Sequence, residues 1–153
     1  MSVRPRLIQL LFLCSLFTTY PAVMKTKKFI RSNAQLPVKN LRETLDYYRV
    51  ELGFFDEWTW KNAHDEVRDG GIRRDEMRLL FAEDPEFTTA INNEKNSLPL
   101  MWFVENVEDV YLEFQNRAVK IADPLRVHPY GLKEFAFVDI NGYYVRVAEG
   151  NEE

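Results

Sequence analysis

A chain of 153 residues suits one domain or two very small ones, and it is long enough to bury a hydrophobic core. Its composition, 46% hydrophobic and 29% charged, is typical of a globular protein, and a net charge of −4 disfavours nucleic acid as a partner. The single cysteine, Cys14, excludes an intrachain disulfide and a cysteine-based zinc site, while two histidines leave little material for metal or nucleophile chemistry.

The first 23 residues differ from the rest. Arg4 and Arg6 precede an apolar run at 7–17, as in a secretory signal, but the run is too short for a membrane span and no clean cleavage pattern follows. The alternative is that translation starts at Met24. Both alternatives stay open. We therefore expect a domain at 24–153 without stable membrane association, in the cytoplasm, or exported if residues 1–23 act as a signal.

The domain contains an internal duplication. Residues 38–48 align with residues 104–114, and every matched pair keeps the same spacing of 66 positions. Asn40 and Asn106 are good helix N-caps, and Glu43 and Asp109 stand three residues after them. Apolar residues then recur at helical spacing in both copies. The pattern predicts one helix after each asparagine.

Strand candidates flank both helices. An extended segment precedes each cap, and β-rich runs follow each helix, while Asn141-Gly142 favours a tight hairpin. The expected strands are 29–38, 54–60, 64–68 and 77–81 in copy one, and 98–104, 120–126, 134–138 and 143–148 in copy two. Residues 69–76 are interpreted as a turn or mobile loop. The sequence therefore predicts an α+β fold of two βαβββ modules, at about 27–88 and 98–150, with mostly antiparallel curled sheets, helices on their outer face, and a linker at about 89–97.

These segments resemble the glyoxalase/bleomycin resistance/dioxygenase (vicinal oxygen chelate) superfamily. The likeness lies in residues 35–41, 47–48 and 52–54, which are similar to the opening module of that family, and in residues 135–142, which are similar to its closing hairpin. The resemblance implies two modules whose sheets curl around a cleft. It also implies a divalent metal in the enzymes of the family, held by His, Gln or Glu on the first and last strands of each module.

The expected metal positions hold unsuitable side chains. These positions hold Asn33, then Met77 or Leu79/Leu80, then Pro99 and Arg146. The side chains of proline, leucine and arginine do not ligate a metal ion. The sequence therefore predicts no metal, no cofactor and no catalytic residue. The resemblance then points to the bleomycin-resistance branch, whose members form homodimers and sequester a drug. The alternative is a metal-dependent lyase, isomerase or dioxygenase of the same superfamily; a pure interaction module is a third.

Candidate ligand contacts follow from strand alternation. We expect polar and aromatic side chains on the cleft faces of the strands and in the loop before the last hairpin, with Trp102 packed under the second helix and His128 structural or solvent-exposed. The predicted ligand-binding residues are Asn33, Gln35, Trp58, Trp60, Phe103, Tyr130, Tyr144 and Arg146. The expected ligand is a bulky apolar or cationic organic molecule such as bleomycin.

Overall fold

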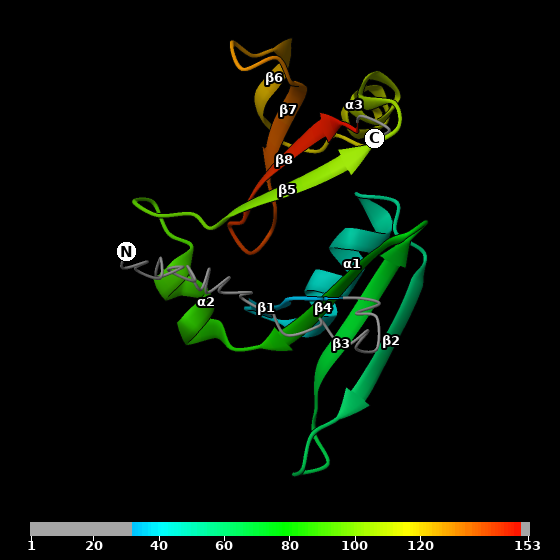
Figure 1. The fold of residues 1–153 in the computed structure, drawn as a ribbon. Coiled ribbons are helices and arrows are strands. Elements are labelled where there is room, and N and C mark those ends of the chain that lie inside the picture. The colour runs from blue at the N-terminus through cyan, green and yellow to red at the C-terminus, as the bar shows by residue number, and fades with distance from the viewer. Residues whose placement is uncertain (1–31, 151–153) are drawn as a thin grey trace, which may run out of the picture. The chain divides into compact units, whose positions relative to one another are not determined.

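The protein is described by a computed structural model over residues 32–150. The predicted leader at 1–23 and residues 29–31 of the first expected strand lie outside these residues. The elements in chain order are β1 (Gln35–Val38), α1 (Leu41–Val50), β2 (Asp56–Lys61), β3 (Val67–Arg74), β4 (Met77–Glu83), α2 (Pro85–Ile91), β5 (Pro99–Val104), α3 (Val107–Asn116), β6 (Ile121–Val127), β7 (Lys133–Val138) and β8 (Tyr144–Glu149). The order βαβββ thus occurs twice, with α2 between the copies (Figure 1). None of the helices within 32–150 is long and apolar enough to cross a membrane.

Each copy forms a four-stranded mixed sheet. The strand orders are β1-β4-β3-β2 in sheet one and β5-β8-β7-β6 in sheet two. In both sheets the first strand of the copy pairs parallel with its last, and the other neighbours are antiparallel. Leu36 stands opposite Phe81, and Trp102 opposite Val147, so the parallel pairs share one register across the 66-residue repeat. The predicted α+β fold of two βαβββ modules is confirmed.

Both predicted helix caps are present. The Asn40 side chain accepts a hydrogen bond from the Glu43 amide at 2.9 Å, and the Asn106 side chain accepts one from the Asp109 amide at 3.0 Å. Each bond satisfies one of the amides that a helix leaves without an internal partner. The two helices therefore begin at equivalent positions for the same reason.

A second cap contact was not predicted from the sequence. The carboxylate of Glu83, at the end of β4, accepts a hydrogen bond from the Leu41 amide at 2.9 Å. The carboxylate of Glu149, at the end of β8, does the same for the Val107 amide at 2.8 Å. Each acid also lies at the positive end of its helix, where a negative charge is stabilising. The duplication thus extends to the contact that joins each helix to its own sheet.

Two predictions from local sequence were wrong, and one helix was not predicted. Residues 69–76 are not a loop, because β3 runs through Gly70 and Gly71 and turns only at 75–76. The strand expected at 64–68 begins later, since the segment before Val67 forms the turn of the β2–β3 hairpin. Helix α2 was not predicted from the sequence; the Asp84 carboxylate accepts a hydrogen bond from the Phe87 amide and caps it.

The glycine pair of β3 has a packing role. A Cβ at Gly71 would lie 2.4 Å from Cζ2 of Trp58 on the neighbouring strand, closer than real atoms approach. The indole ring therefore packs directly against the backbone of β3, which only glycine permits. The glycines that suggested a loop are the condition for pairing β2 with β3.

One core joins the two modules. Tyr48 of α1 contacts Phe81 of sheet one, with ring centroids 5.1 Å apart, and Trp102 of sheet two at 6.3 Å. Trp102 also packs edge-on against Phe54 at 5.9 Å and against Phe137 at 5.5 Å. From here on, the helix-covered side of each sheet, which carries these core residues, is called its inner face. The opposite side, which was predicted to face a cleft, is called its outer face. Helix α1 contributes to burying both inner faces, and Trp102, which was expected under the second helix, packs in the core against Tyr48 of α1.

Candidate functional site

The predicted ligand-binding residues fall into two groups on different sheets. Gln35, Trp58 and Trp60 lie on the outer face of sheet one, because their strand neighbours Leu36 and Glu57 point to the helix side. The other group comes from the outer face of sheet two and the loop before β7, and comprises Phe103, Tyr130, Tyr144 and Arg146. Asn33 is half-buried and precedes β1.

The outer face of sheet one presents two tryptophans. Trp58 is half-buried against Gly71, and the guanidinium carbon of Arg78 lies 5.1 Å from its ring centroid, a cation–π contact. Trp60 is 38% exposed. The Nε2 of Gln35 donates to Asp69 at 2.7 Å on the same face. This face therefore carries two indole rings, one of which is covered by the guanidinium of Arg78.

Phe54 does not belong to this surface. Strict alternation over the expected strand 54–60 would put Phe54 on the same face as Trp58 and Trp60, but β2 begins only at Asp56 and Phe54 is buried. Alternation cannot be extended backward through a segment that is not yet a strand. The ring of Phe54 instead packs on Trp102 and Tyr48 in the core.

A buried carboxylate organises the outer face of sheet two. Glu134 of β7 is only 3% exposed, and it accepts hydrogen bonds from Nε and Nη2 of Arg146 at 2.9 and 2.7 Å. The hydroxyl of Tyr130 donates to it at 2.6 Å. Burial raises the pKa of Glu134, but the hydrogen bonds from Arg146 and Tyr130 lower it by a larger amount. The pKa of Glu134 therefore lies below its ordinary value. This ion pair fixes the Arg146 and Tyr130 side chains.

His128 completes this cluster. Its ring stacks on Tyr130, with centroids 5.0 Å apart. Its Nε2 lies 3.6 Å from Glu134 and 3.7 Å from Asp123, and it has no hydrogen-bond partner within the described residues. The sequence treated His128 as structural or exposed and did not single out Glu134. The sequence did contain a signal for Glu134: it is a charged residue within the otherwise apolar expected strand 134–138, and Arg146 lies on the following strand.

The two groups of predicted residues do not line one cleft within a chain. The inner faces of both sheets pack on α1, since Tyr48 contacts Phe81 and Trp102. Their outer faces therefore point away from this shared core, and Trp60 cannot approach Tyr144 or Arg146 in the same chain.

The family metal positions do not fit a metal in this structure. Leu80 lies on the outer face of sheet one, Pro99 is exposed at the start of β5, and Arg146 is held by Glu134. Within residues 32–150, no group of three or more His, Cys, Asp or Glu side chains has an arrangement that could hold a metal ion. We derive no reaction through a metal from these residues.

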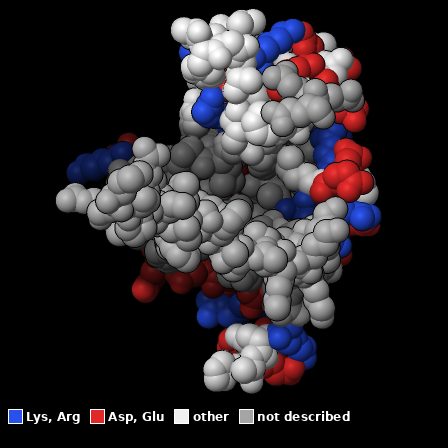
Figure 2. Space-filling view, in the orientation of Figure 1, with Lys and Arg blue, Asp and Glu red and all other residues white. Residues whose placement is uncertain are grey.

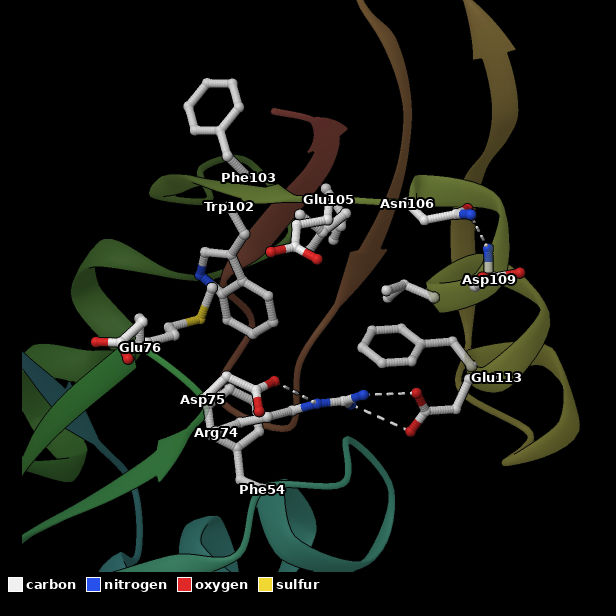
Figure 3. Close-up of a pocket in the computed structure, with 15 residues that line it drawn as sticks. Phe54, Arg74, Asp75, Glu76, Trp102, Phe103, Glu105, Asn106, Asp109 and Glu113 are labelled. Carbon is white, nitrogen blue, oxygen red and sulfur yellow. Dashed lines mark hydrogen bonds and ion pairs between the residues drawn. The ribbon is translucent and has the colours of Figure 1, made fainter. Parts of the chain in front are cut away.

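The structure also contains a cavity that the sequence did not indicate. Its volume is about 670 Å³, and it lies between the β3–β4 turn of module one and α3 with β5 of module two (Figure 3). Its lining residues are Phe54, Arg74, Asp75, Glu76, Met77, Trp102, Phe103, Val104, Glu105, Asn106, Asp109, Val110, Glu113, Phe114 and Val147. Of the predicted site residues only Phe103 is among them. In Figure 3 the Phe103 ring points away from the cavity, toward the outer face.

Charges of both signs lie on the described surface that Figure 2 shows. In Figure 2 acidic and basic side chains alternate on the right of the view and at the tip of the β2–β3 hairpin at the bottom. Thirteen pairs of a Lys or Arg with an Asp or Glu join described residues, and Arg42, Arg49 and Glu57 form one network. The net acidity of the chain therefore does not produce a surface of one sign on this face.

Comparison with known proteins agrees with this architecture. The family model described as Glyoxalase/Bleomycin resistance protein/Dioxygenase superfamily matches residues 31–147. The chain belongs to this superfamily. A comparison with curated proteins finds no match.

Several solved structures share the fold. The bleomycin resistance determinant encoded on the transposon Tn5 superposes with a TM-score of 0.65 at 15% identity, covering 81% of this chain and 100% of that one. The bleomycin-binding protein of Streptomyces verticillus, complexed with copper(II)-bleomycin, gives 0.63 at 22% identity, covering 82% and 99%. TioX from Micromonospora sp. ML1 gives 0.60 at 16% identity, covering 78% and 98%. At these identities the likeness establishes the fold alone.

Proposed function

We propose that this protein binds a bulky organic molecule, of the bleomycin type, without transforming it. The observation that carries the proposal is the pair of outer faces, each of which presents aromatic rings in fixed positions. Trp58 is held against Gly71, and Tyr130 is held by the buried Glu134–Arg146 pair. Rigid, partly exposed aromatic side chains bind flat ligands with little loss of conformational entropy.

The proposed site needs a second copy of the chain. Because the two outer faces of one chain point away from each other, a crevice with aromatic residues on both walls forms when sheet one of one copy faces sheet two of another. Phe103 and Tyr130 are 57% and 59% exposed, and such rings are often buried by a partner. The proposal therefore includes a homodimer with two equivalent crevices.

Other features support binding rather than a metal-dependent reaction. The side chains of Leu80, Pro99 and Arg146 stand where the enzymes of the superfamily are expected to hold their metal, and two of the similar structures are of bleomycin-binding proteins. Drug sequestration in the cytoplasm, and resistance as its consequence, are predictions that rest on the family resemblance.

The first test is a calorimetric titration of the full chain with bleomycin at low and raised salt. We expect saturable binding at about one drug per subunit, with a Kd in the micromolar range or tighter, and weakening by salt if cationic groups of the drug meet acidic side chains. Trp60→Ala and Tyr144→Ala should each weaken binding at least tenfold. Phe87→Ala, at an exposed phenylalanine of α2 that is not among the predicted contacts, is the matched control and should not change the Kd.

Mixing the two variants tests the intersubunit crevice. A heterodimer of Trp60→Ala with Tyr144→Ala has one crevice that carries both changes and one that carries neither. Mixed subunits should therefore recover tight binding at about a quarter of all sites. A monomer at micromolar concentration, or no recovery on mixing, would contradict the dimeric crevice, and absence of bleomycin binding would remove the drug class.

A further inference from the structure

The cavity beside α3 has a counterpart elsewhere in the molecule that is filled. By the 66-residue repeat, α3 corresponds to α1, and the β3–β4 turn corresponds to the β7–β8 connection at 139–143. We call the contact of α1 with residues 139–143 the closed junction, and the contact of α3 with residues 74–77 the open junction. The same elements thus meet twice, but the connection at 75–76 is shorter than the one at 139–143, and the side chains differ.

Polar side chains fill the closed junction. Asn141 is buried; its Oδ1 accepts a hydrogen bond from the Lys39 amide at 2.9 Å, and its Nδ2 donates to Thr44 at 3.0 Å. The hydroxyl of Tyr143 donates to the carbonyl of Pro37 at 2.8 Å. The connection is therefore held against the start of α1 by buried side chains.

The open junction is held apart at one end. The guanidinium of Arg74 binds the Glu113 carboxylate with two hydrogen bonds, at 3.1 and 2.6 Å, and also donates to the carbonyl of Leu52 at 2.7 Å. Arg117 donates to the same carboxylate at 2.9 Å. This bridge sets the distance between the turn and α3, and the turn residues Asp75 and Glu76 stay exposed. The cavity remains beside the bridge.

The floor of this cavity is aromatic. Phe54, Trp102 and Phe114 line it and are each less than one-tenth exposed, so their rings are fixed by the core around them. Figure 3 shows the Trp102 ring extending into the space between Glu76 and α3. A volume of about 670 Å³ falls within the range of roughly 300–1,000 Å³ typical of small-molecule sites.

The rim of the cavity is acidic. Five of its lining residues are acids and one is basic, and that one, Arg74, is occupied by Glu113. Glu76, Glu105 and Asp109 form no ion pair with any residue in 32–150. In Figure 3 the carboxylate of Glu105 points into the same space as the Trp102 ring.

The positive end of α3 does not reverse this charge. The Val107 amide is satisfied by the Glu149 carboxylate, and the Asp109 amide by the Asn106 side chain. The amides that would attract an anion at a helix N-terminus are therefore already used. An electron-rich floor and an acidic rim together favour a positive charge.

We propose that this cavity binds a small organic cation with a flat apolar body, such as an aryl-alkyl quaternary ammonium. The apolar part lies on Trp102, Phe54 and Phe114, and the cationic head lies between the Trp102 ring and the carboxylates of Glu105 and Glu76. The site lies on the inner side of sheet two, within one chain, and is separate from the proposed crevice between copies.

The test titrates the full chain with benzyltrimethylammonium, monitored by calorimetry and by tryptophan fluorescence. Phenylmethanesulfonate, its anionic analogue, and benzyl alcohol, its neutral analogue, are the ligand controls. We expect saturable binding of the cation alone, at one per chain, and weaker binding at raised salt. Equal binding of all three compounds, or binding of none, overturns the proposal. Binding of none is also the result expected if another part of the chain fills the cavity.

Variants locate the site. Glu105→Gln, which removes a charge and keeps the shape, should weaken the cation about fivefold, whereas Glu94→Gln, a charge loss in the exposed linker, should not change the Kd. Val110→Phe, which fills the cavity, should abolish binding while the circular dichroism spectrum is retained. Unchanged binding in both Glu105→Gln and Val110→Phe overturns the assignment. Trp60→Ala and Tyr144→Ala should leave cation binding intact, so this site and the bleomycin crevice can fail independently.

Discussion

The closed and open junctions have the same backbone elements and opposite fillings. In the closed junction the buried Asp139 carboxylate accepts hydrogen bonds at 2.9 Å from Tyr48, Asn141 and Tyr143. At the open junction the turn residue Asp75 is exposed and has only a 3.9 Å ion-pair contact with Arg74. The duplicated fold therefore does not determine where a cavity forms. The side chains at the two connections determine whether a cavity forms there. A buried polar network is stable, and so excludes solvent, only where each of its members has a hydrogen-bond partner.

The largest expected difference between the junctions comes from their aspartates. Asp139→Ala leaves the Tyr48 hydroxyl and two buried amides without an acceptor, so the free energy of unfolding should fall by about 3–4 kcal/mol. Asp75→Ala should cost less than about 1 kcal/mol, most of it from the left-handed backbone at this residue, whose φ is 51°. Urea unfolding of both variants measures the contrast, and equal losses would contradict it.

A smaller difference is expected at equivalent positions of the two helices. Thr44 donates to the carbonyl of Asn40 and accepts from Asn141 in the closed junction. Thr44→Val leaves the Asn141 amide without its acceptor and should cost about 1–2 kcal/mol. Val110, 66 positions later, borders the cavity, so Val110→Leu should change stability by less than about 0.5 kcal/mol. Thermal unfolding of the pair checks this, and a clear loss in Val110→Leu would mean that the open junction is already packed.

The smallest effect concerns the bridge of the open junction and its dependence on pH. Burial raises the pKa of Glu113, but the hydrogen bonds and charges of Arg74 and Arg117 lower it by more, so its folded pKa lies below the ordinary value of a glutamate. An acid with a lowered folded pKa stabilises the protein above its unfolded pKa, and this stabilisation is lost as pH falls through the folded value. Glu113→Gln should therefore cost about 1 kcal/mol at pH 7 and nothing at low pH.

Stability measured from pH 3 to 7 for the wild type and Glu113→Gln tests this sign. The difference between them should shrink as pH falls below about 4.5. Glu94→Gln serves as the matched control. A difference that is constant over this range would show that the Arg74–Glu113 bridge does not hold the junction apart by charge.

The candidate site could be predicted from the sequence in part. Alternation along the strands put Phe103 and Arg146 on the side of the sheet away from the helix, and the structure places them on that side, because alternate side chains of a strand share one face. The partner of Arg146 was not predicted, because Glu134 lies on the neighbouring strand β7, 12 positions away in the sequence. The cavity gave no signal, because its floor and rim come from segments far apart in the chain that share no motif.

The sequence by itself determined the duplicated βαβββ order, the two asparagine caps and the family, because these depend on local hydrogen bonds and on a spacing repeated within one chain. Tertiary structure alone decided that Gly70-Gly71 is strand rather than loop, that the two outer faces point away from each other, and that one junction is filled and the other open. The physical reason is that these outcomes depend on which surfaces meet. The ring of Trp58 over Gly71 and the Asn141 side chain against α1 are contacts between segments that local propensity does not relate.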